Sequence, residues 1–344
     1  MPDVVALGDA NVDIIAHFGH LPAKGEDALA SSTEIHCGGS AANTAMVLAR
    51  MGIETNLISR VGPDSWALKI FSCLNDAGVS PSSLQRDATA MTGLMYVIVT
   101  PDGERTILGN RGANVYTDPN QIREEAFREA RLFHLSGYSL LQDPQRSAAL
   151  RALEIACRYN LTITMDPGMA VPQQALDEMH ALLPVVDVLL PSLAEAQQLT
   201  GKVKAEQCAQ ALVDLGVSQV ALKLGAEGCL VADRDRAFRV PGFVVQTRDS
   251  TGAGDNFDAG LIAGFLRGLG WHGAAVLGNV LGAMAAARVG GGTALPDMQD
   301  ILALLRDQQA EPDQQGLKEA IQQVSHFVAG LVTEPEEEDK PWWN

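Results

Sequence analysis

The order of apolar and polar residues along the chain predicts short buried strands that alternate with amphipathic helices. Residues 4–8 form a short apolar run typical of a buried strand, and residues 40–51 have helical spacing after a Ser40 cap. The same alternation continues through most of the chain. It favours an α/β fold with a Rossmann-like, mostly parallel sheet that is covered by helices on both faces.

The remaining elements follow the same two patterns. The last two predicted helices contain the apolar stretch 261–287, which Arg267 and His272 interrupt. We interpret this stretch as a buried helix pair rather than a membrane span. Further strands are predicted at residues 55–61, 131–135, 161–165, 185–190, 219–224 and 243–247, and helices at residues 65–77, 144–159, 172–183, 254–269 and 273–288.

Two segments depart from this alternation. Residues 13–37 carry short polar and apolar alternations, and residues 91–114 carry two β-rich runs around Pro101-Asp102-Gly103-Glu104. Because proline presets φ and glycine accepts positive φ, this tetrapeptide predicts a hairpin turn. We therefore expect a β-rich lid (13–37 and 91–114), an α/β domain (1–12, 38–90 and 115–333) and an acidic mobile tail (334–344).

Composition excludes several function classes. The chain has 344 residues, of which 47% are hydrophobic, and 25 Lys and Arg against 42 Asp and Glu give a net charge of −17. A nucleic-acid partner needs clustered basic residues, so we expect neither such a partner nor a membrane partner. The five cysteines are odd in number and lack C-x-x-C spacing. This argues against a disulfide framework or a structural zinc site and indicates a cytoplasmic protein.

The strongest candidate for catalysis is the stretch from Asp249 to Phe257, DSTGAGDNF, which opens a predicted helix. Gly252 and Gly254 let a ligand approach the backbone, and the helix start offers N–H groups and partial positive charge to an anion. Asp255 at this cradle is placed to accept the proton of an attacking hydroxyl in phosphoryl transfer. The alternative is an ordinary glycine-rich turn with an acid favoured by the helix dipole. The sequence has neither a P-loop nor a dinucleotide fingerprint.

A second cluster lies near the beginning of the chain. Asn11 and Asp13 follow the first strand, while Gly38, Gly39 and Asn43 open the next helix. Carboxylate and amide groups can satisfy buried hydroxyls, so this cluster predicts a polyol site. The alternative is a solvent-facing acid, a glycine turn and an incidental asparagine.

Two further clusters follow predicted strands. Ser192 and Glu195 come after the strand at 185–190, and Glu195 can hold Mg²⁺ through water. Alternatively, Glu195 is a first-turn glutamate favoured by the helix dipole. Lys223, followed by Gly225 and Gly228, can approach ATP phosphates or simply end a strand at a β-turn.

Together these motifs resemble those of the ribokinase-like, PfkB-type carbohydrate and nucleoside kinases. The resemblance extends over about residues 4–300, and two such signatures at this separation are specific. The matching residues are 249–255 with Phe257, Ala259 and Gly260 for the C-terminal signature, Gly38-Gly39 with Asn43, Ala45 and Gly52 for the N-terminal signature, Gly8, Asn11 and Asp13 for the opening substrate motif, and 103–106 and 112–114 for the lid hairpin and the return to the main domain.

The resemblance implies a Rossmann-like domain with a small β-sheet lid, ATP and Mg²⁺ as cofactors and, as in many relatives, a monovalent cation such as K⁺. It assigns Asp255 as the base and the N–H groups of Gly252, Ala253 and Gly254 as the anion hole. It assigns the substrate to Asn11, Asp13, Gly38, Gly39, Asn43 and Arg105, and the nucleotide to Ser192, Lys223, Gly225, Gly228 and Asn279. Glu195 would hold Mg²⁺ through water, and Asp249 and Thr251 would hold the monovalent cation with backbone near residues 290–292.

The sequence also departs from the family pattern. Ser192 stands where the family's N-x-x-E motif has asparagine, so we expect altered nucleotide or metal contacts. Arg111 either favours an anionic substrate or faces solvent. We expect phosphorylation of a hydroxyl of a small sugar or polyol. A nucleoside (adenosine-like) kinase and a non-catalytic sugar- or nucleotide-binding regulator are the alternatives, and the open edges of the lid would permit a homodimer.

Overall fold

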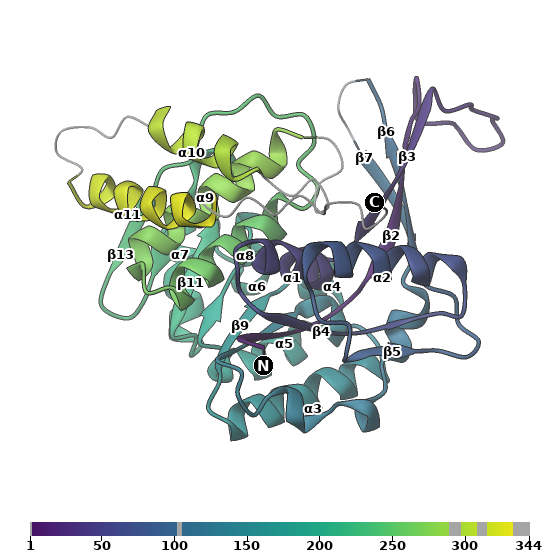
Figure 1. Cartoon of the computed structure of the whole chain (residues 1–344), viewed down its shortest axis with the longest axis horizontal. Coiled ribbons are helices and arrows are strands. Elements are labelled where there is room, and N and C mark those ends of the chain that lie inside the picture. The colour runs from purple at the N-terminus through teal and green to yellow at the C-terminus, as the bar shows by residue number, and fades with distance from the viewer. Residues whose placement is uncertain (1, 102–104, 289–296, 308–314, 333–344) are drawn as a thin grey trace, which may run out of the picture.

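The computed structural model describes residues 2–101, 105–288, 297–307 and 315–332. In these residues, the main sheet has nine strands in the order β13-β12-β11-β10-β9-β8-β1-β4-β5 (Figure 1). Its strands are β1 (Val4–Leu7), β4 (Thr55–Val61), β5 (Leu84–Arg86), β8 (Leu132–Ser136), β9 (Thr162–Asp166), β10 (Val188–Leu189), β11 (Gln219–Lys223), β12 (Cys229–Ala232) and β13 (Ala237–Val240).

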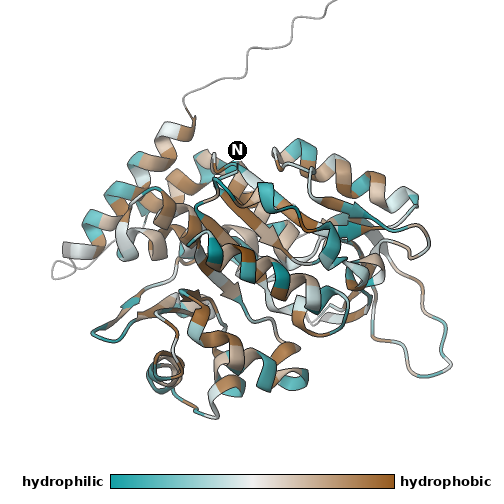
Figure 2. Ribbon diagram, turned by 90° about the horizontal axis from the view of Figure 1, so that it is seen from below, coloured by the Kyte–Doolittle hydropathy of each residue, from teal (hydrophilic) through white to brown (hydrophobic). Residues whose placement is uncertain are grey.

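The sheet is parallel from β5 to β11 and antiparallel at β12 and β13. Successive side chains of a strand point to opposite faces, and both faces here are apolar. On β8, for example, Leu132 belongs to the buried cluster that includes residues of α8 and α9, whereas Phe133 belongs to the buried cluster on the other face, which includes residues of α3 and α7. Figure 2 shows the apolar residues gathered on these inner strands. The predicted parallel sheet with helices on both faces is confirmed.

Helices cover both faces of the sheet. Among them, α8 and α9 form the predicted buried pair, and no helix in the described part of the chain is long and apolar enough to span a membrane. The helices are α1 (Ser40–Arg50), α2 (Ser65–Ala77), α3 (Gln145–Arg158), α4 (Val171–Gln174), α5 (Leu176–Leu182), α6 (Leu193–Thr200), α7 (Ala205–Asp214), α8 (Ala253–Leu266), α9 (Gly270–Ala286), α10 (Met298–Asp307) and α11 (Gln315–Val332).

A second, smaller sheet projects from the body, and we call this sheet the lid (Figure 1). Its strands are β3 (Ser32–Gly38), β2 (Asn11–His17), β6 (Gly93–Val99) and β7 (Arg105–Asn110), in that order. The arms β6 and β7 pair antiparallel, as a hairpin requires. The predicted turn at residues 101–104 falls largely on residues 102–104, which lie outside the described residues, as does the predicted tail 334–344.

Three local predictions are wrong. Residues 243–247 form no strand, because Pro241 has no N–H for the ladder and Gly242 packs against the Ala226 carbonyl as the chain leaves the sheet. Ser40 is the first helical residue rather than the cap: the N-cap of α1 is Gly39, with φ of 98°. The predicted helix 172–183 is divided at Ala175, whose φ of −143° is not helical.

The cysteines also differ from the prediction. Cys37 at the end of β3 and Cys73 on α2 form a disulfide, with their Cα atoms 6.6 Å apart. The two residues are 36 positions apart, so no short spacing motif signals the pair. Cys37 lies opposite Val12 of β2, on the face of the lid that packs against α2. The fold therefore brings together two cysteines that the sequence alone does not connect.

Candidate active site

The starts of α1 and α8 meet at Asp255. The Asn43 side-chain Nδ2 donates to Asp255 Oδ2 at 2.7 Å, and the Thr44 hydroxyl donates to the Asp255 carbonyl at 3.4 Å. Burial raises the pKa of the Asp255 carboxyl to about 6, while the Asn43 hydrogen bond opposes this rise and the charge of Asp166 adds to it. The structure thus holds a carboxyl of near-neutral pKa at the first turn of α8.

Asp13 of β2 lies against the entry to α1. A Cβ atom at Gly38 would fall 2.1 Å from Asp13 Oδ2, so only glycine leaves room for this carboxyl. Burial raises the pKa of Asp13 to about 7, and the charges of Asp255 and Asp249 add to the rise. Asp13 Oδ1 and Asn43 Oδ1 are both buried and accept no hydrogen bond from the described residues. We call Asp13, Asn43 and Asp255 the acceptor site.

The glycine turn before α8 brings together the residues predicted to bind anions. Gly252 caps the helix with φ of 71°, in the left-handed region that favours glycine. Thr251 donates to Asp249 Oδ1 through both its N–H (2.9 Å) and its hydroxyl (2.6 Å). The Ala253 N–H points to the Ser250 carbonyl at 3.3 Å. The first-turn N–H groups after it have no carbonyl of their own helix to bind.

A buried ion cluster lies behind this turn, formed by Asp166, Lys223 and Asp258. Lys223 Nζ is 2.8 Å from Asp166 Oδ2 and 3.0 Å from Asp258 Oδ1. Burial alone would lower the pKa of Lys223, but the two carboxylates outweigh burial and raise it. The nearest atom to a Cβ placed at Gly254 is Lys223 Nζ, 3.6 Å away. The ion cluster therefore joins β9, β11 and α8 directly behind the predicted anion hole.

Ser192 and Glu195 form a capping box at the start of α6. The Ser192 hydroxyl accepts from the Glu195 N–H at 3.3 Å, and Glu195 Oε2 accepts from the Ser192 N–H at 2.7 Å. Burial raises the pKa of Glu195, and the charge of Asp166 adds to this rise. The S-x-x-E spacing was the signal for this cap, and our sequence analysis did not use it.

The remaining nucleotide candidates lie in turns and on α9. Gly225 and Gly228 both have positive φ, and a Cβ at Gly228 would fall 2.2 Å from the Val240 carbonyl. Asn279 Nδ2 donates to the carbonyls of Val240 and Pro241, both at 3.0 Å. The side chain of Arg105 and the backbone near residues 290–292 lie outside the described residues.

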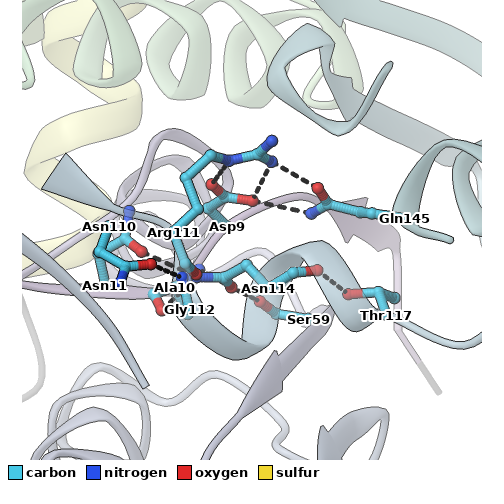
Figure 3. A network of polar contacts seen from close by, with 10 residues as sticks. All are labelled: Asp9, Ala10, Asn11, Ser59, Asn110, Arg111, Gly112, Asn114, Thr117 and Gln145. Carbon is cyan, nitrogen blue, oxygen red and sulfur yellow. Dashed lines mark hydrogen bonds and ion pairs between the residues drawn. The ribbon is translucent and has the colours of Figure 1, made fainter. Parts of the chain in front are cut away.

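A second polar network, which the sequence analysis missed, lies at the base of the lid (Figure 3). Arg111 binds both carboxylate oxygens of Asp9, at 2.7 and 2.8 Å, and Gln145 contacts both residues. Arg111 is therefore paired and does not simply face solvent. The sequence feature that could have predicted this network is Asp9, which directly follows the first strand. The carboxyl ends of parallel strands meet at one edge of a sheet, so an acid at this position lies among other strand ends.

Two hollows of about 630 and 650 Å³ are lined by residues other than those of the acceptor site. The first is lined by the beginnings of β9 to β11, at the edge of the sheet opposite to Asp166 and Lys223. The second lies at the lid base, around Met91 and Tyr116. We place the active site at the convergent polar groups, because ligands of open α/β sheets bind outside the carboxyl ends of the strands.

Comparison with known proteins identifies the family. Residues 1–298 match the family model described as pfkB family carbohydrate kinase. The chain belongs to the pfkB family. An ATP-dependent ribose-1-phosphate kinase of Halopiger xanaduensis is 31% identical to this pfkB kinase, over 89% of this chain and 99% of the relative.

Solved structures agree with the family assignment. The ribokinase of Arabidopsis thaliana, solved with ribose and ATP, is 26% identical and superposes with a TM-score of 0.78 over 89% of this chain and 99% of that chain. A putative ribokinase II of E. coli, solved with ATP and Mg²⁺, has a TM-score of 0.80 at 23% identity, over 90% of this chain and all (100%) of that chain. This pfkB protein is therefore a carbohydrate or nucleoside kinase with the ribokinase fold.

Proposed function

We propose that this kinase transfers the γ-phosphoryl group of ATP to a primary hydroxyl of a small neutral sugar or polyol. The observation that carries the proposal is the pair of buried acceptors, Asp13 Oδ1 and Asn43 Oδ1, which lack donors among the described residues. A buried acceptor without a donor is costly, and a hydroxyl is a donor of the right kind. Both acceptors flank Asp255, so a hydroxyl held there lies beside a carboxyl.

In this proposal Asp255 is the base and Asp13, Asn11, Gly38, Gly39, Asn43 and Arg105 bind the substrate. The Asp255 carboxylate accepts the proton as the hydroxyl oxygen attacks the phosphorus atom in line with the leaving ADP oxygen. The Asn43 amide, 2.7 Å from Asp255 Oδ2, fixes the direction of the carboxylate. The N–H groups of Gly252, Ala253 and Gly254 would face the transferring phosphoryl group, where negative charge develops, and the Ala253 N–H would leave the Ser250 carbonyl, 3.3 Å away, to do so.

The charges near the site support a neutral substrate. Arg111 is bound by Asp9, and Lys223 is bound by Asp166 and Asp258. The acceptor site itself contributes the carboxyls of Asp13 and Asp255, and Asp249 adds negative charge nearby. An anionic sugar would approach these carboxyls with repulsion, whereas a polyol can donate to them.

The nucleotide and the metal ions complete the proposal. ATP would lie along Ser192, Lys223, Gly225, Gly228 and Asn279, at the carboxyl ends of β10 and β11. Glu195 fits Mg²⁺ bound through water, because only one of its oxygens is used by the capping box. Mg²⁺ would neutralise phosphate charge. We propose Asp249 and Thr251 as ligands of a monovalent cation such as K⁺, since their oxygens already converge.

A homodimer through the lid is part of the proposal. One row of side chains crosses the four strands of the lid on the face away from Asp13, and the register aligns Ile35, Ile14, Tyr96 and Leu108. Ile35, Tyr96 and Leu108 are 45%, 48% and 57% exposed. A second lid would cover this row. Light scattering should show a dimer that Tyr96→Ser dissociates, and a monomeric parent protein would contradict this part of the proposal.

The decisive experiment measures ADP release with MgATP against neutral sugars, sugar acids, sugar phosphates including ribose 1-phosphate, and nucleosides, each with and without K⁺. We expect a neutral sugar or polyol to give the highest kcat/KM, and Asp255→Asn to abolish the signal. Asp214→Asn, at the exposed end of α7, is the matched control and should retain full activity. A nucleoside as the best acceptor would select the adenosine-like alternative, and ligand binding without ADP release would select the regulator.

A further inference from the structure

Asn114 lies at the point where the chain returns from the lid to the body, in the short 3₁₀ helix Gly112–Tyr116. It is fully buried (0% exposed). Its Oδ1 accepts from the Ala10 N–H at 3.0 Å and from the Ser59 hydroxyl at 2.9 Å. Its Nδ2 donates to Asn11 Oδ1 and to the Arg111 carbonyl, both at 2.8 Å (Figure 3). One side chain therefore joins the strand that enters the lid, the segment that leaves it, and β4.

Backbone groups fix which way the Asn114 amide points. A backbone N–H only donates and a carbonyl only accepts, so the atom facing the Ala10 N–H must be Oδ1. The other atom faces the Arg111 carbonyl and must be Nδ2. The side-chain atom of Asn11 that meets this Nδ2 must then be an acceptor, Oδ1. The Ala10 N–H and the Arg111 carbonyl thus determine the orientation of the Asn11 amide, because they orient Asn114, which contacts it.

The space around this contact is fitted to it. Gly93 pairs with Asn11 across the lid sheet, and a Cβ atom at Gly93 would fall 2.1 Å from Asn11 Oδ1 and 2.6 Å from Asn114 Nδ2. Any side chain at position 93 would therefore separate the two amides. Asn11 and Asp13 are two residues apart on β2, so their side chains point to the same face, which is the face of the acceptor site.

We propose that Asn114 is a positioning residue for catalysis, which holds the Asn11 amide so that its Nδ2 donates to a substrate hydroxyl. This inference rests on the proposed function, in which Asn11 binds substrate. Asn11 then complements its neighbour: Asp13 accepts a hydrogen bond from the sugar and Asn11 donates one. One sugar hydroxyl accepts a hydrogen bond from Asn11, and another donates a hydrogen bond to Asp13. Because the two residues require opposite hydrogen-bonding roles, they fix the direction of the sugar in the site.

The test replaces the donor that Asn11 presents to the substrate with an acceptor. Asn114→Asp places a carboxylate oxygen against Asn11, whose amide then turns to donate to it and presents Oδ1 to the substrate. Asn11→Asp leaves Asn114 unchanged and also presents an oxygen, so it tests the orientation even if Asn114→Asp folds poorly. For both variants we expect KM for the best sugar to rise about 10-fold or more, with a smaller change in kcat.

Deoxy analogues of that sugar separate positioning from general damage. The analogue that lacks the hydroxyl bound by Asn11 should have the same KM in the parent protein and in both variants, whereas the other analogues should show the full rise. Ser59→Ala is the matched control, because Asn114 Oδ1 keeps the Ala10 N–H; it should lower Tm and leave KM within about twofold. A uniform rise for every analogue, or an unchanged KM in Asn11→Asp, would overturn the inference.

A readout without substrate separates this inference from the kinase proposal. In ¹⁵N-labelled full-length protein, the Asn11 side-chain NH₂ resonance should shift in Asn114→Asp, when the amide turns onto the new carboxylate, and stay unchanged in Ser59→Ala. An unshifted resonance in folded Asn114→Asp would refute the positioning role even in an active kinase. If the parent protein released no ADP with any sugar of the panel, the proposed function would be refuted. The resonance result would still test the orientation of Asn11.

Discussion

The acceptor site and the ion cluster lie next to each other and both contain carboxyls, which are buried in the ion cluster and half-buried at Asp13 and Asp255, yet the two regions differ in how these carboxyls are satisfied. In the ion cluster, Lys223 lies within 3.0 Å of both Asp166 and Asp258. In the acceptor site, Asp13 and Asn43 each retain a buried oxygen without a donor among the described residues. A cluster that satisfies itself supports the fold, whereas one that does not leaves room for a ligand.

Asp255→Asn should produce the largest effect and separate the two regions most sharply. Removal of the proposed base should lower kcat by roughly 10²–10⁴. Because burial raises the pKa of Asp255 from 3.8 to about 6, its ionisation costs stability, and this cost is fully present above pH 6. The asparagine variant should therefore be more stable at pH 8, by on the order of 1–3 kcal/mol. Steady-state kinetics and urea unfolding check both expectations, and a fully active variant would contradict the role of Asp255.

Lys223→Met should destabilise the protein, whereas Asp255→Asn should stabilise it. It leaves Asp166 and Asp258 buried without their shared cation, so the free energy of unfolding should fall by about 3–5 kcal/mol at pH 7. Denaturant unfolding of the variant against Lys202→Met, an exposed lysine near α6, measures the difference. A loss of activity at unchanged stability would show instead that Lys223 acts mainly on the nucleotide.

The pH dependence of catalysis tests the acceptor site in the intact protein. A base must be ionised, and the ionised fraction of Asp255 falls as the pH drops through its pKa of about 6. Below this pH, kcat/KM should fall about tenfold per pH unit, and Asp13, with a pKa of about 7, should begin the decline earlier. A profile that stays flat down to pH 5 would exclude both carboxyls from the rate.

Asp13→Asn should give the smallest of the four effects. The variant can still accept a hydrogen bond through its amide oxygen, so KM for the sugar should rise about 10-fold and kcat should change less. The inflection near pH 7 should disappear while that near pH 6 remains. Glu34→Gln, at an exposed position of β3, is the control and should match the parent. Loss of the inflection near pH 6 instead would exchange the assignments of the two carboxyls.

Sequence reasoning predicted the fold more completely than the contacts within the site. Helix α1 and strand β4 were located within one residue, because apolar spacing and the glycine pair report directly on local structure. The strand predicted at 243–247 failed because the breaks at Pro241 and Gly242 outweigh a short apolar run. Sequence reasoning identified Asn43 and Asp255 in two separate motifs but did not predict the contact between them, since 212 residues separate them.

The missed contacts share one physical cause. Asp9 with Arg111, Asn114 with Ser59, and Cys37 with Cys73 are pairings between distant segments, and the sequence carries no local period that reports them. The capping box of Ser192 and Glu195 is different, because its three-residue spacing was available and was assigned to nucleotide and metal instead. Contacts between residues close in the sequence can therefore be predicted from it, whereas the partner of a buried polar group is known only once the fold is known.

The Cys37–Cys73 bond has a consequence for how the lid can move. It joins the base of β3 covalently to α2, while β7, at the far edge of the same sheet, has no such bond to the body. The β7 edge is held to the body by an ion pair and hydrogen bonds instead, since Arg111, directly after β7, binds Asp9 and the buried Asn114 accepts from the Ala10 N–H. Reduction of the disulfide should therefore release the β3 edge of the lid from α2, while the β7 edge keeps its contacts with the body.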